Sequence, residues 1–483
     1  MRRFLRIAIL FILPVILLAQ DGVPLFTRDF PPQEFAERRQ KIYTAIGKNL
    51  ALMQGAPSPA GYTRFRQSNE FYYVCGIEVP HAYLLMDGAT QRASLYLLHR
   101  NESRERAEGK LLSAEDADLV KSLSGVDAVF PIEMLAEHLG RSMRGREARA
   151  LYTPLQPPEG FAMSRDLAVR ANTDAASDPW DGTTPRQESF VRLLKSRFPI
   201  FEIKDLSPLL DEIRLIKSAR EIDVIRKSTR LSGLALIESM RSTRPGVVEF
   251  ELDAVSKYIY YRNGAQGEAY YSLVASGPNA AIGHYNAGKR TMKDGDFLLM
   301  DFGPDVGYYM SDLTRMFPVN GKFNGWQREL YGVYLGFYKA ILNAIKPGKT
   351  AQAIKQEALK EMDQILSRAK FSKPLYENAA KTFVENYRRG AESPQTTLGH
   401  WVGMSTHDVG WWTGPLKAGM VFTIEPALRV NEEQINIRLE DMILITDRGA
   451  ENLSSFVPME INDIEKVMVE EGMLQRYPMD GGK

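Results

Sequence analysis

The sequence predicts a protein of the α+β class that folds into two domains. Three observations support this prediction. The chain has 483 residues, which is more than a single hydrophobic core usually holds. Its first part is dominated by strand-like runs separated by polar turns, whereas long helical stretches alternate with pairs of strands after about residue 206. No fixed repeat occurs, which argues against a solenoid. The domains are predicted at residues 20–205 and 206–470, followed by a polar tail at 471–483.

Residues 1–19 are predicted to be a secretory signal. MRRFLR carries three arginines, and IAILFILPVILLA adds thirteen uncharged and mostly apolar residues. A basic start before a short apolar core is typical of a signal peptide, and the run is shorter than the ~20 residues that span a bilayer. We therefore expect a periplasmic or secreted protein, cleaved after Ala19 and without stable membrane association. If the signal stayed uncleaved, it would anchor the protein to the membrane.

Charge and cysteine content narrow the class of protein. Lysine and arginine number 61 against 60 aspartates and glutamates, so the chain has no global basic field that would favour nucleic acid. The one cysteine, Cys75, excludes an internal disulfide, and its apolar and aromatic neighbours predict a buried, inert thiol. Stability must therefore come from the burial of apolar side chains.

The first domain is predicted to contain a helix and several strands. Residues 32–55 combine helical spacing with an apolar end, and residues 65–100 are predicted as strands joined by polar turns. A charged helical stretch follows near 101–123. Residues 173–188, NTDAASDPWDGTTPRQ, are rich in turn-forming residues and are predicted to be a long loop.

The second domain is predicted to begin with a long helical stretch that has a weak point. This stretch runs from about residue 206, is weakest near Lys217–Ser218 and ends at Pro245–Gly246. Further helices are expected at about 249–263, 326–346 and 351–370, and the clearest strands are FLLMDFG, YMSDLTRMFPV, GMVFTIEPALRV and INIRLEDMILIT.

The first pair of these strands predicts a hairpin that opposes two acids. FLLMDFG and YMSDLTRMFPV flank residues 304–307, PDVG, which is a strong turn signal. A turn centred on Val306–Gly307 would set Asp301 opposite Asp312. The Cβ atoms of such a cross-strand pair lie ~5 Å apart, and two like charges there are destabilising. The hairpin is therefore expected to hold a cation.

The second pair of strands repeats the arrangement. Folding about residues 431–434 would set Glu425 opposite Glu440, and Pro426 predicts an edge or a bulge beside the first of them. The neighbours of all four acids are Val, Phe, Ile, Leu and Met, which favours buried acids over solvated ones on a sheet face. A buried carboxylate without a partner is costly, and a divalent ion removes that cost.

Histidines complete the predicted metal site. Only six occur in the chain, and His400 and His407 lie together in TTLGHWVGMSTHDVG. One should supply a nitrogen ligand and the other should lie near the substrate, although their spacing does not decide which. Carboxylates with an imidazole suit Mn²⁺, Fe²⁺, Co²⁺ or Zn²⁺ better than Ca²⁺. Four acids exceed the need of one ion, so two ions are expected.

These motifs resemble a known family. DFGPDVGYYMSD, LGHWVGMSTHDVG, FTIEP and IRLED resemble the creatinase/methionine aminopeptidase-like metallopeptidases. FRQSNEFYYVCG and IRLIKSAREIDVIRKS are similar to the amino-terminal domain and linker of the aminopeptidase P family within that group. The resemblance covers residues 30–470. It implies a pita-bread catalytic domain preceded by a smaller, creatinase-like α/β domain.

The resemblance also implies a set of metal ligands. Asp301, Asp312, His400, Glu425 and Glu440 match the five ligands of two divalent ions, of which Mn²⁺ is the first choice and Zn²⁺, Co²⁺ and Fe²⁺ are alternatives. Asp312 and Glu440 match the ligands that bridge the ions, and Glu425 matches the residue that also handles the proton.

Four further residues match positions beside the ligands or around the substrate. His284 and His407 match histidines that act in catalysis near the substrate, and Tyr270 matches a substrate-binding residue. Arg438 matches an arginine two residues before the last ligand. Because residues i and i+2 of a strand share a face, Arg438 is expected to contact Glu440.

The chain departs from the family pattern in two places. Thr396–Thr397 stands where relatives often carry His-Gly, which removes an imidazole from the substrate side. The segment between Glu425 and Glu440 is short compared with many relatives, which would reshape the rim of the pocket.

The predicted function is a metal-dependent aminopeptidase. It would remove the first residue from peptides with proline in second position by attack of a metal-bridged hydroxide. Alternatives are an Xaa-Pro dipeptidase, a metal-free creatinase-like hydrolase, and a non-catalytic peptide-binding protein with the same fold. The resemblance also implies a homo-oligomer.

Overall fold

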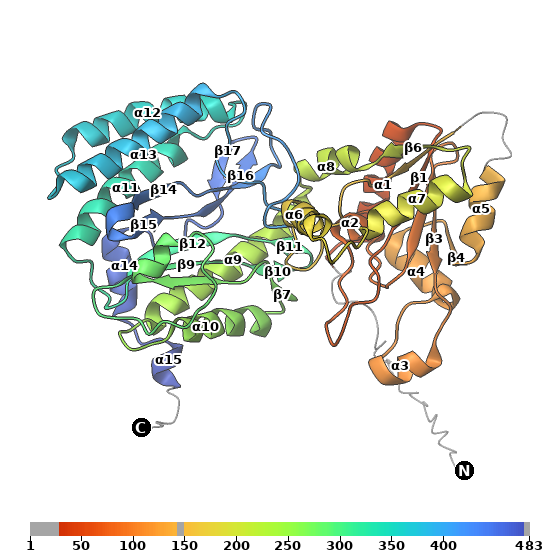
Figure 1. Ribbon diagram of the computed structural model, residues 1–483, viewed down its shortest axis with the longest axis horizontal. Coiled ribbons are helices and arrows are strands. Elements are labelled where there is room, and N and C mark those ends of the chain that lie inside the picture. The colour runs from red at the N-terminus through yellow and green to blue at the C-terminus, as the bar shows by residue number, and fades with distance from the viewer. Residues whose placement is uncertain (1–28, 143–148, 478–483) are drawn as a thin grey trace, which may run out of the picture.

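The computed structural model describes residues 29–142 and 149–477 and places them in two domains that lie side by side (Figure 1). The amino-terminal domain occupies the right of the figure and the carboxy-terminal domain the left, with α8 (Ser207–Leu215) between them. The predicted signal at residues 1–19 lies outside the described residues. None of the helices in the described ranges is long and apolar enough to cross a membrane.

A six-stranded mixed sheet forms the centre of the amino-terminal domain. Its strand order is β4-β3-β2-β1-β5-β6; the β1–β2 and β2–β3 pairs are antiparallel and the others are parallel. The strands are β1 (Leu50–Gln54), β2 (Tyr83–Asp87), β3 (Arg92–Leu97), β4 (Ala128–Pro131), β5 (Ala150–Thr153) and β6 (Glu202–Asp205). The helices are α1 (Pro32–Ile46), α2 (Asn69–Cys75), α3 (Glu102–Glu108), α4 (Ala117–Ser124), α5 (Met134–Ser142), α6 (Arg165–Ser177) and α7 (Arg186–Arg197).

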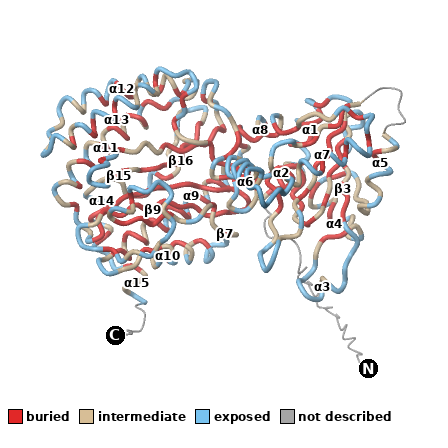
Figure 2. Tube along the Cα trace, in the orientation of Figure 1, coloured by how far each residue is buried: buried red, intermediate tan, exposed pale blue. Residues whose placement is uncertain are grey.

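Both faces of this sheet are covered, because the strand side chains alternate between two cores. Leu50 and Leu52 pack with side chains of α5 and α7, whereas Ala51 and Met53 pack with side chains of α1, α2 and α4. This is the two-residue period of a strand buried on both sides. Figure 2 shows the buried stretches along these strands and the exposed ones on the outer helices.

Two expectations for this domain were wrong. EFYYVC, expected as part of a strand, lies in α2, which follows Ser68, ends at Cys75 and is capped by Gly76 in the left-handed conformation. All seven residues of α2 are buried, so the run shows no helical alternation of polar and apolar residues. The loop expected at 173–188 is shorter, because α6 continues to Ser177 and α7 begins at Arg186.

The weak point expected at Lys217–Ser218 is confirmed as a helix boundary. α8 ends at Leu215 and α9 (Ala219–Ser242) begins after Ser218. The Ser218 hydroxyl accepts a hydrogen bond from the amide of Glu221, whose carboxylate accepts one from the amide of Ser218. This capping box starts a new helix.

The carboxy-terminal domain places its strands between two sets of helices, which is the arrangement expected of a pita-bread fold (Figure 1). α9 and α10 contact the strands on one side, and α13 contacts β14 on the other. The strands form small antiparallel sheets, β12-β9-β8, β13-β16-β17, β14-β15 and β11-β10-β7. The helices are α10 (Glu249–Arg262), α11 (Gly325–Ala344), α12 (Ala351–Arg368), α13 (Pro374–Glu392), α14 (Ile461–Met468) and α15 (Met473–Arg476). The strands are β7 (Gly267–Glu268), β8 (Leu273–Ser276), β9 (Phe297–Phe302), β10 (Pro304–Val306), β11 (Tyr309–Met310), β12 (Leu313–Pro318), β13 (Val421–Ile424), β14 (Ala427–Val430), β15 (Ile435–Arg438), β16 (Asp441–Thr446) and β17 (Gly449–Asn452).

The register expected for the first hairpin was wrong by two residues. Asp301 pairs with Thr314 and not with Asp312. The turn is centred on Gly307 and Tyr308, whose φ angles of 56° and 73° are both positive, as a type I′ turn requires. A shift of two residues preserves the face of each side chain, so Asp301 and Asp312 still point the same way as diagonal neighbours.

The register expected for the second hairpin is confirmed. Ile424 pairs with Asp441 and Ala427 pairs with Arg438, so Glu425 and Glu440 face each other where the pairing is interrupted. The interruption lies at Pro426, as expected, because proline cannot donate a hydrogen bond to the ladder.

Candidate metal centre and active site

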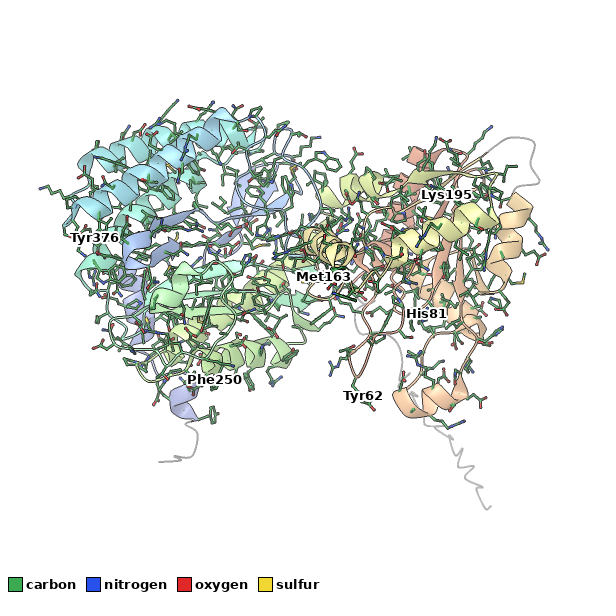
Figure 3. All side chains as sticks on the ribbon, in the orientation of Figure 1. Tyr62, His81, Met163, Lys195, Phe250 and Tyr376 are labelled. Carbon is green, nitrogen blue, oxygen red and sulfur yellow. The ribbon has the colours of Figure 1, made fainter. Side chains whose placement is uncertain are left out.

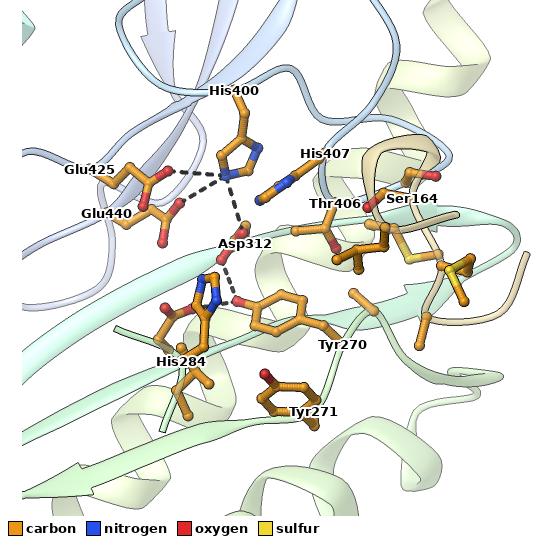
Figure 4. Close-up of a pocket in the computed structure, with 18 of the residues that line it drawn as sticks. Ser164, Tyr270, Tyr271, His284, Asp312, His400, Thr406, His407, Glu425 and Glu440 are labelled. Atoms are coloured by element: carbon orange, nitrogen blue, oxygen red, sulfur yellow. Dashed lines mark hydrogen bonds and ion pairs between the residues drawn. The ribbon is translucent and has the colours of Figure 1, made fainter. Parts of the chain in front are cut away.

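The five predicted ligands line one pocket, together with Tyr270, His284, His407 and Arg438 (Figure 4). His400 lies at the centre of the acids. Its Nε2 atom is 3.5 Å from Asp312 Oδ2, 3.3 Å from Glu425 Oε1 and 3.5 Å from Glu440 Oε1. Donor atoms of Asp312, His400 and Glu440 all lie within 4.8 Å of one another. The two hairpins and the histidine loop therefore meet at one point.

Close backbone contacts set these side chains. The loop before His400 lies against β13: the Thr423 amide donates to the His400 carbonyl at 2.9 Å. Gly399 makes this approach possible, since a Cβ atom there would lie 2.2 Å from the Thr423 carbonyl oxygen. Gly303 plays the same part between β9 and Ser311, where an added Cβ would lie 1.7 Å from a carbonyl oxygen. Glycine is required at both positions because any side chain would push the ligands apart.

The electrostatics of the cluster fit a divalent cation. Glu440 is 1% exposed and Asp312 is 5% exposed. Burial, followed by the neighbouring Glu440, raises the pKa of Glu425 to about 8, and burial with the nearby Asp312 raises the pKa of Glu440. Glu440 Oε2 accepts a hydrogen bond from the Thr314 hydroxyl, whereas its Oε1 atom is buried and accepts none. Carboxylate oxygens and an imidazole nitrogen together form a donor set for Mn²⁺, Zn²⁺, Co²⁺ or Fe²⁺.

Asp301 joins the cluster through two neighbouring side chains. The Tyr270 hydroxyl lies within hydrogen-bond distance of both Asp301 and Asp312 and can donate its one proton to either carboxylate, so the phenol lies among the acids as well as lining the pocket. Arg438 pairs with Asp301 and lies 3.6 Å from Glu425.

The contact expected between Arg438 and Glu440 was therefore wrong. β15 ends at Arg438, so the rule that residues i and i+2 share a face does not extend to Glu440. Arg438 lies opposite Ala427 on the neighbouring strand, and from there its guanidinium reaches the carboxylates of Asp301 and Glu425.

The other two histidines predicted for the site lie in the same pocket. His284 and His407 both line it, and the His407 ring lies 4.3 Å from the His400 ring between their centroids. Thr396 is buried, and its hydroxyl accepts a hydrogen bond from Lys355 of α12 at 2.7 Å. This hydroxyl is therefore held towards α12.

The amino-terminal domain lines the same pocket, which the sequence analysis did not predict. The residues concerned precede α6 or lie in its first turn, and Met163 is seen between the two domains in Figure 3. They are Gly160, Ala162, Met163, Ser164 and Leu167. Their composition is ordinary, and they lie more than 100 residues from the nearest predicted ligand in the chain, so only the folded structure brings them to the site.

Comparisons with known proteins agree with this geometry. A family described as metallopeptidase family M24 matches residues 223–447, and the aminopeptidase P amino-terminal domain matches residues 35–152. The Xaa-Pro aminopeptidase of Haemophilus influenzae is 31% identical over 91% of this chain and 97% of its own length. The human Xaa-Pro dipeptidase is 27% identical over 92% of this chain and 94% of its own.

Solved structures of aminopeptidases also match this chain over nearly its whole length. The aminopeptidase PepP of Pseudomonas aeruginosa matches with a TM-score of 0.72 and 27% identity, covering 91% of this chain and 98% of that one. The similarity therefore spans both domains and both hairpins. The chain belongs to the aminopeptidase P family, as an M24 metallopeptidase whose pita-bread catalytic domain follows an aminopeptidase P amino-terminal domain.

Proposed function

We propose that this protein is an Xaa-Pro aminopeptidase, which removes the first residue from peptides that carry proline in second position. The observation that carries the proposal is the convergence of four carboxylates and His400 at the base of a pocket with apolar walls. The curated relative with 31% identity has this activity in its name. Peptides are the substrates that an M24 peptidase implies.

Two divalent ions, with Mn²⁺ as first choice, would be held by Asp301, Asp312, His400, Glu425 and Glu440. When bound, such ions supply a water of lowered pKa and polarise a carbonyl group. Four acids around one imidazole support two ions rather than one, because the negative charge exceeds what a single divalent ion balances.

Glu425 is the residue that we assign to proton transfer in the proposed reaction. Its side chain is 29% exposed, more than those of Asp312 and Glu440, so it is the acid of the cluster that faces the substrate. Glu425 would accept a proton from the attacking water and deliver it to the leaving nitrogen. Arg438, 3.6 Å from Glu425, keeps this carboxylate oriented.

His284 and His407 would stabilise charge on the scissile carbonyl oxygen. Both rings line the pocket beside the acid cluster, and donors placed in advance at such a position lower the barrier of acyl transfer. Apolar walls from Met163, Leu167 and Leu273 suit a proline ring and the side chains next to it.

A dipeptidase that cleaves only Xaa-Pro is the second candidate, supported by the similarity to the human Xaa-Pro dipeptidase. Purified protein would be given Ala-Pro-Ala, Ala-Pro and Ala-Ala-Ala, with and without Mn²⁺ after treatment with a chelator. We expect metal-dependent release of alanine from Ala-Pro-Ala. Cleavage of Ala-Pro alone would establish the dipeptidase, and no cleavage of any peptide by the metal-loaded protein would leave a binding protein.

Export and self-association are also proposed. The basic and apolar start of the chain supports a periplasmic or secreted location. The family resemblance supports a homo-oligomer, and sedimentation of the purified protein would measure its mass.

A further inference from the structure

His407 is held by a residue of the other domain. Its Nδ1 atom lies 2.9 Å from Oδ2 of Asp166, which is the second residue of α6. The other carboxylate oxygen of Asp166 accepts a hydrogen bond from the Ser164 hydroxyl. In Figure 4 the His407 ring reaches into the space beside His400 and Asp312.

The loop that carries His407 is fixed by buried ion pairs. The neighbouring residue, Asp408, is 8% exposed and pairs with Arg214 at 2.5 Å and with Lys217 at 3.0 Å. Arg214 also pairs with Glu159 at 2.6 Å, close to the start of α6.

The start of α6 is fixed in the same way. Arg165 binds Glu70 at 2.9 Å and Asp211 at 2.7 Å. Both partners of the Asp166–His407 contact are therefore attached to rigid neighbours, although the two side chains themselves are about half exposed.

This contact decides which ring nitrogen the substrate meets. Hydrogen bonds from His407 and then from Ser164 hold the pKa of Asp166 well below its ordinary value, so the carboxylate only accepts. The proton of the contact therefore lies on Nδ1 and Nε2 faces the pocket, where the imidazolium form of the ring can donate to the carbonyl oxygen of a substrate. Without an acceptor at Nδ1, the ring is free to rotate or to carry its proton on Nε2.

We infer that Asp166 is a positioning residue for His407, so that the amino-terminal domain takes part in the active site of its own chain. The expected change in kcat rests on the proposed peptidase activity. The expected position of the proton on the His407 ring does not. The two consequences are therefore measured separately.

The kinetic measurement uses Asp166→Ala, His407→Ala and the double variant with Ala-Pro-Ala as substrate. We expect Asp166→Ala to lower kcat by roughly tenfold or more while KM changes little, as for other carboxylates that orient a histidine. Asp166→Glu should restore part of the loss. Asp174→Asn, an exposed acid of the same helix, is the matched control and should keep the wild-type rate.

The double variant separates positioning from helix stability. If Asp166 acts through His407, its removal should cost nothing further in the His407→Ala background. An equal loss in both backgrounds would overturn the inference, because it would show that Asp166 supports α6 and not the imidazole. Unchanged kcat in Asp166→Ala would also overturn it.

The second measurement is independent of activity. ¹⁵N-labelled histidine spectra of the full chain, recorded after chelation and again with diamagnetic Zn²⁺, would report the proton on each ring nitrogen, with His407 assigned from the His407→Ala spectrum. We expect a protonated Nδ1 in the wild type and loss of that preference in Asp166→Ala. A bare Nδ1 in the wild type, or no change in Asp166→Ala, would refute the inference even in an active enzyme. A protonated Nδ1 that depends on Asp166 in a chain without peptidase activity would support the contact and remove only the proposed function.

Discussion

Asp312 is the acid whose loss should be most informative at the scale of single residues. It is buried, contacts His400 and Tyr270, and matches a bridging ligand in the proposed pair of ions. Asp312→Asn removes one negative charge from the donor set without changing its volume. We expect metal content to fall and peptidase activity to drop by several orders of magnitude, because both proposed ions lose a shared ligand.

Metal analysis and circular dichroism on the same preparation would test this expectation. Asp294→Asn, an exposed acid shortly before β9, is the control and should keep metal and activity. Full metal occupancy with full activity in Asp312→Asn would mean that the ligand assignment is wrong.

The two histidines of one loop should behave differently. His400→Ala removes the nitrogen at the centre of the acids and should lose metal and activity together. His407→Ala should keep the metal and lower kcat/KM by about 10²-fold, the size of one lost donor to an oxyanion. Metal analysis and peptide kinetics on both variants would check the assignment. A metal-free His407→Ala beside a fully loaded His400→Ala would reverse it.

At this scale the sequence predicted which side chains meet but not all of their contacts. Asp301, Asp312, Glu425 and Glu440 stand out because acids are rare inside apolar strands. Arg438 was placed against Glu440 because its strand was expected to continue for two more residues. Asp166 carried no signal at all, since its partner His407 lies 241 residues away in the chain.

At the scale of elements, Gly399 links loop geometry to metal binding. Gly399→Ala would place a Cβ atom 2.2 Å from the Thr423 carbonyl oxygen, so the loop must move away from β13 and take His400 with it. We expect the variant to lose about 1–3 kcal/mol of stability and to bind metal more weakly.

Thermal unfolding and metal titration would measure both effects. Gly414→Ala is the matched control, because no atom lies within 4 Å of the added Cβ. Equal metal affinity in Gly399→Ala and the wild type would show that the close approach to β13 does not position His400.

Elements with a clear period or a clear cap could be predicted from the sequence, and the others could not. The boundary at Ser218 was predicted from a weak point in the helical pattern, and the structure shows the capping box that accounts for it. The hairpin turn was misplaced by one residue because Tyr308 adopts a positive φ that its residue type disfavours. α13 was overlooked, although its buried residues Tyr376, Ala379, Ala380, Phe383 and Val384 recur at helical spacing.

At the scale of the whole molecule, buried ion pairs join the domains. Arg214 is 1% exposed and bonds Glu159 and Asp408. Arg214→Met would leave two buried carboxylates without this partner, so we expect a loss of about 3–5 kcal/mol in the free energy of unfolding. Urea unfolding would measure it, with the exposed Arg220→Met as the control. A loss equal to that of the control would show that the pairs are not needed for stability.

The chain as synthesised should be longer than the mature protein. The basic and apolar start predicts cleavage after Ala19, so the mature chain should begin at Gln20. Amino-terminal sequencing of protein from the cell envelope or the medium would check this. Recovery of a chain that starts at Met1 from the cytosol would contradict it.

The contact between α6 and the loop that carries His407 limits which amino-terminal domains could replace the native one. Exchange of the amino-terminal domain with that of another family member would bring a foreign residue to position 166 and foreign partners to Arg214. Such a chimera would keep every metal ligand and still meet its substrate with a misaligned imidazole. A chimera of two relatives should therefore be fully active only where residue 166 and the histidine loop come from the same parent.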